Sequence, residues 1–256
     1  MKYLVALLIL GACAARAQPP TDDVALALIH ANVIDGVADE VLRDATVLVR
    51  GGRIESVGRV AVPEASEVLD LAGRWLLPGL VDAHAHVFNL AGARRLLELD
   101  TTTVRVLGTS NFADVRMREL HAAGATDVPR VIAAGYQVRP DVVDAFPDFL
   151  LDFPQMLSLR GGLHGPDDLR RVVRALAEQR VDFIKVLANE RAGTPGTDPL
   201  TRTFSDEELG VIVDEAHKHG LPVAAHAYTD DAVRAFVLAG GRTVEHVQLV
   251  SNETLT

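Results

Sequence analysis

The sequence predicts an α/β fold in which a small antiparallel sheet precedes a parallel sheet covered by helices. Between residues 26 and 76, short runs of branched apolar residues alternate with glycine turns, which is typical of antiparallel strands. After Pro78 the pattern changes to strand followed by helix, repeated several times. The later strands are apolar on both faces, as strands of parallel sheets are. A barrel and a doubly wound sheet both fit this second part.

Turn residues define the elements of the first part. Strands are expected at Leu26–Val33, Ala45–Val49 and Arg53–Val57, followed by turns at Ile34-Asp35-Gly36, Gly51-Gly52 and Gly58. Glycine supplies the positive φ that tight turns between strands require.

Hydrophobic periodicity defines the elements of the second part. We expect strands near 80–84, 102–107, 130–136, 182–187, 222–226 and 243–247, and helices at Asp168–Gln179, Asp206–His219 and Asp230–Ala239. Ser205 and Glu208 have the spacing of a capping box, and Gly220 stands where the second of these helices should end. No Gly-x-Gly-x-x-Gly or Walker pattern follows any strand, which argues against a nucleotide-binding fold.

Composition and charge exclude several classes of protein. Of 256 residues, 48% are hydrophobic and 23% are charged, which excludes disordered, collagen-like and disulfide-scaffold proteins. The net charge of -10 and the lack of a basic block argue against a nucleic-acid partner. The single cysteine, Cys13, lies in the N-terminal apolar stretch, so a mature protein without it has no thiol nucleophile.

The first residues have the pattern of an export signal. Lys2 precedes an apolar run over 3–12, and Ala15-Arg16-Ala17 offers a small-x-small cleavage site. We therefore expect a signal peptide over 1–17 and a periplasmic or secreted protein. The alternative is a lipoprotein with a lipid anchor at Cys13, because Leu10-Gly11-Ala12-Cys13 resembles the corresponding cleavage site. The apolar run is too short to span a bilayer, and no later run is long enough.

Two His-x-His pairs in the sequence have opposite interpretations. His84 and His86 close the strand near 80–84, where residues i and i+2 point to the same side and can bind one metal ion. His217 and His219 fall at the end of a helix, where i and i+2 point in nearly opposite directions. This second pair fits a solvated helix terminus, whose dipole favours histidine.

Two further strands end in histidine, and a lysine lies inside another strand. Lys185 lies inside the apolar strand Phe183–Leu187, where a buried ammonium without a partner would be costly. A lysine that reaches solvent from the strand end is the simpler alternative. His226 and His246 end two further strands, so four histidines stand at the face where barrel sites form. We take the four histidines as metal ligands, whereas the spacing alone favours a Lys185 that reaches solvent.

At this point the sequence resembles a known family. The segment Pro78–His86, with Asp82-Ala83-His84-Ala85-His86 at its end, is similar to the first-strand motif of the amidohydrolase superfamily of metal-dependent hydrolases. The resemblance is strongest to the branch of imidazolonepropionase-like proteins and exported Xaa-Pro or Xaa-Arg dipeptidases. It also rests on Thr102-Thr103-Val104-Arg105, Ile184-Lys185-Val186, Ser205–Leu209, His226-Ala227-Tyr228 and Val244-Glu245-His246.

The resemblance implies a TIM-like (β/α)8 barrel and a composite β-sandwich. The domains would be the signal peptide at 1–17, the N-terminal portion of the sandwich at 18–76 and the barrel at 77–256. It also implies two divalent ions, usually zinc, with His84 and His86 on the first ion and His226 and His246 on the second. Lys185, carboxylated by carbon dioxide, would bridge them, and a metal-bridging hydroxide would attack a carbon–nitrogen bond.

Two departures from the family pattern stand out. The family's last ligand, an aspartate after the eighth strand that serves as general base, is absent from this sequence, and only about six barrel strands are expected. The barrel is therefore expected to be incomplete, truncated at its C-terminal end. Val106 stands where relatives commonly carry an aspartate, so polar contacts of the second strand are not expected from that position.

Weaker candidates lie around the site. Tyr228 could hydrogen-bond a substrate carbonyl or carboxylate, and His164 could reach substrate from the segment 137–166. That segment is long and rich in Phe and Pro, which predicts a lid or pocket wall. We interpret Asp82 as structural. The remaining histidines are interpreted as surface or packing residues; they are His30 and His121.

Three functions from different classes remain. The first is a metal-dependent amidohydrolase acting on a small amide, a cyclic amide or a dipeptide. The second is a catalytically impaired remnant that at most binds metal or ligand, and the third is a mononuclear deaminase-like site. The lysine disfavours the third function, because such sites lack a bridging lysine on the fourth strand. Neither the substrate nor the oligomeric state follows from the sequence.

Overall fold

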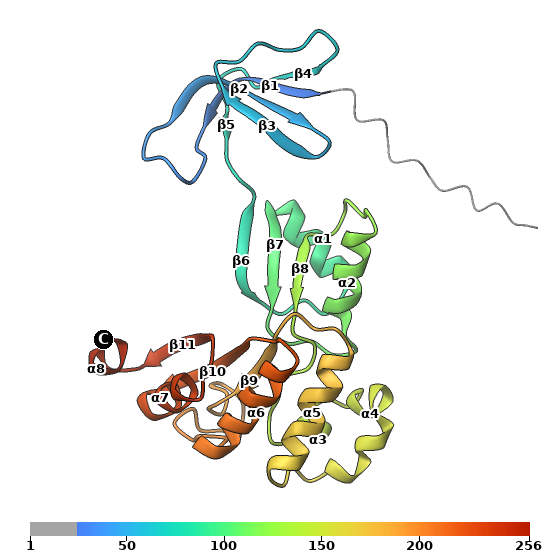
Figure 1. Cartoon of the computed structure of the whole chain (residues 1–256), viewed down its shortest axis with the longest axis vertical. Coiled ribbons are helices and arrows are strands. Elements are labelled where there is room, and N and C mark those ends of the chain that lie inside the picture. Colours follow the sequence, from blue (N-terminus) through green and yellow to red (C-terminus); the bar gives the residue numbers. More distant parts are fainter. Residues whose placement is uncertain (1–24) are drawn as a thin grey trace, which may run out of the picture. The chain divides into compact units, whose positions relative to one another are not determined.

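The computed structural model describes residues 25–256, which form two compact units divided between Pro78 and Gly79 (Figure 1). The division falls just after the expected boundary between residues 76 and 77. The predicted signal peptide at 1–17 and the anchor alternative at Cys13 lie outside the described residues.

The N-terminal unit is one sheet with the strand order β3-β2-β1-β4, in which β5 also pairs with β1. Its strands are β1 (Leu26–Val33), β2 (Leu42–Arg50), β3 (Arg53–Gly58), β4 (Glu67–Asp70) and β5 (Trp75–Leu76). The prediction of a purely antiparallel sheet is wrong. The backbone crosses from β3 to the far side of β1, and β4 and β5 consequently pair with β1 in parallel.

The hairpin between β2 and β3 follows from its turn residues. Gly51 and Gly52 have φ of 56° and 70°, and Arg50 pairs with Arg53 across them. Two successive positive φ values are the geometry of a type I′ turn, whose twist matches that of antiparallel strands. The predicted turn at this position is confirmed.

The C-terminal unit contains two three-stranded parallel sheets, ordered β6-β7-β8 and β11-β10-β9. Their strands are β6 (Leu80–Ala85), β7 (Thr101–Val106), β8 (Arg130–Ala133), β9 (Ile184–Leu187), β10 (Val223–Thr229) and β11 (Thr243–Leu249). All six predicted strands are present. The third ends earlier than expected, and a parallel bridge between Val138 and Val186 then joins its continuation to β9.

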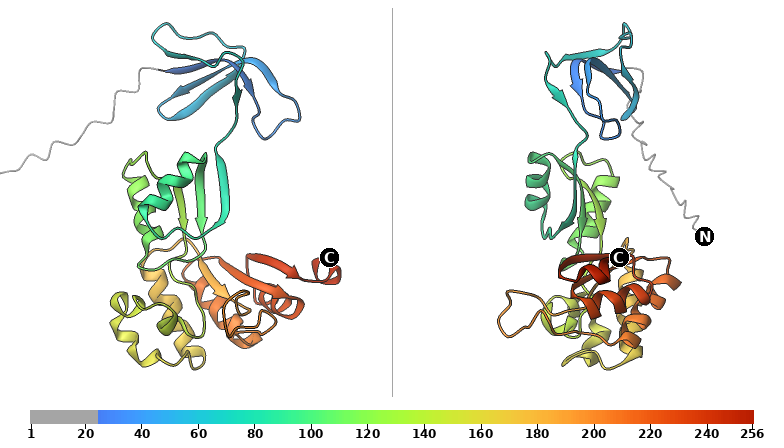
Figure 2. Two further views of the ribbon diagram at one scale, coloured as in Figure 1. Left: turned by 180° about the vertical axis from the view of Figure 1, so that it is seen from behind. Right: turned by 90° about the vertical axis from the view of Figure 1, so that its left-hand side faces the viewer.

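Helices alternate with these strands and lie beside them (Figures 1 and 2). They are α1 (Leu90–Glu98), α2 (Ala113–Ala122), α3 (Val142–Ala145), α4 (Phe149–Asp152), the 3-10 helix η1 (Pro154–Leu159), α5 (Pro166–Glu178), α6 (Asp206–Lys218), α7 (Asp230–Leu238) and α8 (Asn252–Leu255). The capping box predicted at Ser205 and Glu208 starts α6, and Gly220 follows its end with φ of 70°. The α/β class and its parallel sheets are confirmed.

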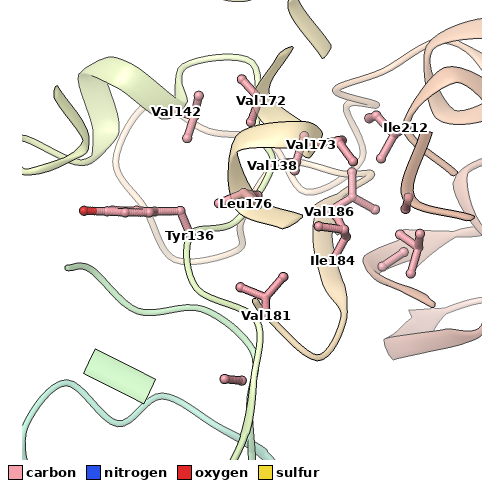
Figure 3. Packing of buried hydrophobic residues seen from close by; sticks show 14 of the residues in the cluster. Tyr136, Val138, Val142, Val172, Val173, Leu176, Val181, Ile184, Val186 and Ile212 are labelled. Atoms are coloured by element: carbon pink, nitrogen blue, oxygen red, sulfur yellow. The ribbon is translucent and has the colours of Figure 1, made fainter. Parts of the chain in front are cut away.

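The core of this unit lies between the strands and the helices that cover them. Figure 3 shows Val173 of α5 near Val186 of β9, and Val172 of the same helix on the side of Val142. These side chains are fully buried. Because β9 is apolar on both faces, any polar side chain on it is enclosed by this core.

The long segment between β8 and α5 was predicted to be a lid or a pocket wall, and its phenylalanines pack into the core of the unit. Phe149 and Phe153 are buried and pack edge-on or tilted around Tyr136, with ring centroids 5.1 and 6.5 Å away. Aromatic rings in such contacts stabilise a core rather than a mobile flap. The first residues of the segment, Gln137 and Arg139 to Asp141, line cavities, as does Asp152.

No helix within residues 25–256 has the length and apolar character that crossing a membrane requires.

Candidate active site

The five predicted ligand residues line one cavity of about 100 Å³ in the C-terminal unit. They come from β6, β9, β10 and β11 and the residue after β6: His84, His86, Lys185, His226 and His246. The other lining residues are Gln137, Leu187, Arg191, Ala192 and Tyr228. Side chains that are far apart in the sequence therefore share one small space.

His84 and His86 are held by hydrogen bonds at the same ring atom. Nδ1 of His84 lies 3.0 Å from Oε2 of Glu245, and Nδ1 of His86 lies 2.8 Å from the Gly108 carbonyl. Carbonyl and carboxylate oxygens only accept, so each Nδ1 donates, which in the neutral ring leaves the lone pair on Nε2. Ligating histidines usually have this arrangement.

His246 has an unusual backbone conformation that brings it into the site. Its φ is 78°, in the left-handed region that non-glycine residues rarely adopt. Successive side chains of a regular strand point to opposite faces, yet Glu245 bonds His84 and the His246 ring lies 4.9 Å from the same ring. The left-handed turn explains how neighbours reach one partner, and such strain is typical of functional sites.

His226 lies between His246 and Tyr228, with ring centroids 4.5 Å from each. It is buried, and burial, followed by the neighbouring His246 and Lys185, lowers its pKa to about 3. Burial also lowers the pKa values of His86 and His246. These three imidazoles are therefore neutral at pH 7, which is the form that binds metal ions.

Lys185 is 1% exposed and its Nζ has no hydrogen-bond partner. Burial lowers the pKa of Lys185 to about 7, although the charge of Glu245 opposes the shift. Near neutral pH a large share of the amine is therefore unprotonated. The alternative of a lysine that reaches solvent does not agree with this placement.

Glu245 and Arg105 form a support that the sequence did not predict. Arg105 donates from Nη1 to Oε1 of Glu245 over 2.9 Å and from Nη2 to Oγ1 of Thr243 over 2.7 Å. Its guanidinium lies 4.7 Å from the centre of the Phe183 ring. Burial raises the pKa of Glu245, but the bond from His84 and the charge of Arg105 outweigh it, so the net shift is downward. Both residues stand in motifs that carry the family resemblance, but nothing in those motifs indicates that the two side chains meet.

Gln137 and Gly108 form a second support. Nε2 of Gln137 donates to the Leu107 carbonyl, and the residue is buried. A Cβ on Gly108, whose φ is 130°, would lie 2.5 Å from the Gln137 side chain. Glycine is therefore required where the backbone passes Gln137 and offers its carbonyl to His86.

Of the two weaker candidates for substrate contact, only one lines the cavity. Tyr228 is buried and lines the cavity, whereas His164 does not line it. Asp82 accepts a hydrogen bond from the backbone N–H of His84, which is a structural contact as expected. Val106 is buried, and the polar contacts of its strand come from Arg105 instead.

The remaining histidines lie away from the cavity. His30 pairs with Asp70 at the surface of the N-terminal unit, and His121 bonds the Val128 carbonyl. His217 and His219 stand at the end of α6, as expected for a helix terminus.

The donor set is suited to metal ions only with the lysine included. Among residues 25–256, no three His, Cys, Asp or Glu side chains are placed to hold one ion by themselves. Two buried nitrogens in the cavity nevertheless have no partner, Nζ of Lys185 and Nε2 of His226. Buried polar atoms are normally satisfied, so these two nitrogens fit ligands of an added group.

The comparisons with known proteins agree with this geometry. The model of the amidohydrolase family matches residues 75–255. An uncharacterised protein of Mycobacterium tuberculosis is 29% identical over 212 residues, which cover 77% of this chain and 52% of that protein. The imidazolonepropionase of Deinococcus radiodurans is 27% identical, with 81% of this chain and 59% of that protein covered.

A solved structure has the same fold over most of the protein. A prolidase complexed with N-methylphosphonate-L-proline is 26% identical with a TM-score of 0.72, covering 90% of this chain and 62% of that one. The present chain spans about half the length of the first curated relatives that it matches. The family match extends over both three-stranded sheets and every residue of the cavity, and the chain belongs to the amidohydrolase family.

Proposed function

We propose that this protein holds the metal centre of a hydrolase that cleaves carbon–nitrogen bonds of small amides, cyclic amides or dipeptides. The observation that carries the proposal is the convergence of four histidines and an unpartnered buried lysine on one cavity. Hydrolases within the family support the amide chemistry.

The proposed centre holds two divalent ions, with zinc as the expected metal. His84 and His86 serve the first ion, His226 and His246 serve the second, and Lys185 joins them. Two histidines per ion are too few for a tetrahedral zinc site, so a shared further ligand is needed.

Lys185 meets this need if it carries a carboxylate derived from carbon dioxide. The unprotonated amine is the form that reacts, and burial maintains that form near pH 7. The resulting anion would no longer suffer the cost of a buried ammonium, because two cations would neutralise it.

The protein's own residues would then orient the reaction. Two bound ions would supply a water of lowered pKa and a Lewis acid for the substrate carbonyl. Glu245 and the Gly108 carbonyl fix the rings of His84 and His86 so that Nε2 faces the cavity. The Tyr228 side chain, buried beside His226 and His246, would donate a hydrogen bond to the substrate carbonyl or carboxylate.

We also propose that the two parallel sheets are six strands of a TIM-like (β/α)8 barrel and that the N-terminal sheet is part of a β-sandwich. The bridge between Val138 and Val186 joins the sheets in the order β6 to β11. Arg105 of β7 reaches Glu245 of β11, as inward side chains of a closed barrel do.

Export is a separate proposal that rests on residues 1–17 alone. A fusion of residues 1–40 to a phosphatase that is active only outside the cytoplasm would test it. Activity that disappears when Leu7 and Leu8 are replaced by arginine is expected, and a cytoplasmic, uncleaved fusion would contradict it.

The experiment for the main proposal measures metal content and turnover together. Protein prepared with zinc and bicarbonate should contain about two ions per molecule and hydrolyse members of a panel of dipeptides, N-acyl amino acids and cyclic amides. Replacing both His226 and His246 by alanine should lower the content by about one ion. Unchanged content would contradict the ligand assignment, and two ions without turnover would favour the remnant that only binds metal.

A further inference from the structure

A second, larger cavity adjoins the candidate centre. It has a volume of about 370 Å³ and shares Leu187 and Arg191 with the smaller cavity that holds the histidines. Its other lining residues are Arg139, Pro140, Asp141, Glu190, Thr194, Thr197 and Thr203. A molecule lying in the larger cavity would therefore pass Arg191 on its way to the histidines.

Arg191 differs from the other charged residues of this cavity. Arg139 donates from Nε and Nη2 to the two carboxylate oxygens of Asp141 over 2.5 and 2.9 Å. Oε2 of Glu190 accepts the backbone N–H of Asp198. Among residues 25–256, no carboxylate forms an ion pair with the Arg191 guanidinium, although the side chain is exposed between the two cavities.

The backbone of Arg191 is held in place. Asn189 pairs with Arg202 in an antiparallel bridge, and the N–H of Glu190 donates to the Thr201 carbonyl. Oγ1 of Thr197 donates to the Arg191 carbonyl over 2.6 Å. A long side chain that starts from a fixed backbone loses less freedom when it binds a ligand.

The charge of Arg191 faces the candidate centre. It is among the lesser causes that lower the pKa values of His86, Lys185 and His226. A free cation beside a site for two dications is unfavourable unless an anion lies next to it. Substrate can supply that anion.

We propose that Arg191 binds a carboxylate of the substrate, whose amide lies at the histidines and whose remaining part fills the larger cavity. This inference rests on the proposed function and adds the substrate class, an N-acylated amino acid or peptide with a free carboxylate. The planar guanidinium matches a carboxylate with two parallel hydrogen bonds, which no neutral side chain of either cavity offers.

The test compares matched ligands that differ only at the carboxylate. Metal-free protein, which cannot hydrolyse them, is titrated calorimetrically with N-acetyl amino acids and with the corresponding N-acetyl amino acid amides. Wild-type protein should bind the carboxylates about 10- to 100-fold more tightly than the amides. Arg191→Gln should abolish this preference, and Arg191→Lys should restore only part of it.

The control is Arg116→Gln, because Arg116 is also exposed and lines a cavity that contains none of the ligand histidines. It should retain the wild-type preference. Equal binding of carboxylate and amide by wild-type protein, or a preference that survives in Arg191→Gln, would overturn the inference.

Turnover separates this inference from the proposed function. In zinc-loaded protein, Arg191→Gln should raise KM for carboxylate substrates about 10- to 100-fold and lower the carboxylate-over-amide ratio of kcat/KM by a similar factor. Absence of turnover with every ligand, together with an intact carboxylate preference in binding, would refute the hydrolase and leave the Arg191 site standing.

Discussion

Two segments of this protein read His-x-His, and they have opposite surroundings. His84 and His86 end β6, lie 5.6 Å apart between ring centroids, and face His246 and Lys185 across a cavity. His217 and His219 end α6, where His219 Nε2 lies 3.8 Å from Glu215 and neither residue lines the cavity. The comparison shows that His-x-His spacing indicates a shared binding site only when the two residues lie on a strand. A strand aims both rings at one point, whereas a helix end directs them apart.

Removing each pair in turn should have the largest effect. Replacing His84 and His86 by alanine should lower turnover at least about a thousandfold, because a bound ion that stabilises the transition state by several kcal/mol is lost. Replacing His217 and His219 should leave metal content and turnover within about twofold of wild type. Metal analysis and rate measurements on both double variants check this. Equal losses of metal content and turnover in the two variants would contradict the assignment of different roles to the two pairs.

Lys185→Met should separate function from stability. The folded-state pKa of about 7 lies below the ordinary value of 10.5, so the unfolded protein binds more protons between these pH values. Stability of the metal-free wild type should therefore rise by roughly a few kcal/mol as pH increases from 7 to 10, because the folded protein already holds Lys185 neutral while the unfolded protein gradually loses the free energy of binding a proton. The variant should lack this rise, be the more stable protein at pH 7, and bind no second ion.

Urea unfolding at pH 7 and pH 9.5 measures the effect. If the unfolding free energies of wild type and Lys185→Met changed equally between pH 7 and pH 9.5, Lys185 would be hydrated rather than buried.

Glu245→Gln should weaken metal binding about 10- to 100-fold, because the carboxylate that orients His84 is replaced by an amide. Asp70→Asn is the matched control, since Asp70 bonds His30 over the same 3.0 Å at the surface of the other unit. Competition with a chelator gives both affinities. Equal affinities in the two variants would count against the support role.

Glu215→Gln concerns the helix-end pair and should affect stability alone. Glu215 is buried and accepts bonds from Arg174 and Lys218, and the bond from Arg174 is the main cause that lowers its pKa to about 2. Its contribution is therefore present above pH 4.5, the ordinary value, and is lost as pH falls toward 2. The variant should lose about 1–3 kcal/mol of unfolding free energy at pH 7.

Exposed Glu207 on the same helix offers the control, and Glu207→Gln should change stability by less than about 0.5 kcal/mol. Thermal unfolding measures both. A change of metal content in Glu215→Gln would contradict the interpretation that the end of α6 has no part in the candidate metal site.

The sequence predicted the elements of the C-terminal unit because strand and helix periodicity are local properties. The six strands, the capping box and the placement of the four histidines followed from spacings of a few residues. The support from Arg105 to Glu245 could not be found this way, since the bond joins residues 140 positions apart.

Two further features depended on tertiary context. The left-handed conformation of His246 has no mark in the sequence, because a histidine in that position usually continues the strand. The segment after β8 was predicted to be a lid or a pocket wall from its phenylalanines and prolines, but composition does not say which side of a segment the core occupies. Tyr136 and its neighbours decided that.

The bond between His84 and Glu245 joins residues 161 positions apart, and this separation has a consequence for how the protein folds. The ends of so long a loop meet late, after the intervening strands and helices have formed. During folding, His84 and His86 are therefore in place before β10 and β11 bring His226 and His246 beside them. If the proposed zinc centre forms, an ion bound at that stage would have only two ligands, and tight binding would require that β11 has packed against the other strands. Uptake kinetics during refolding would consequently report the slowest step of assembly.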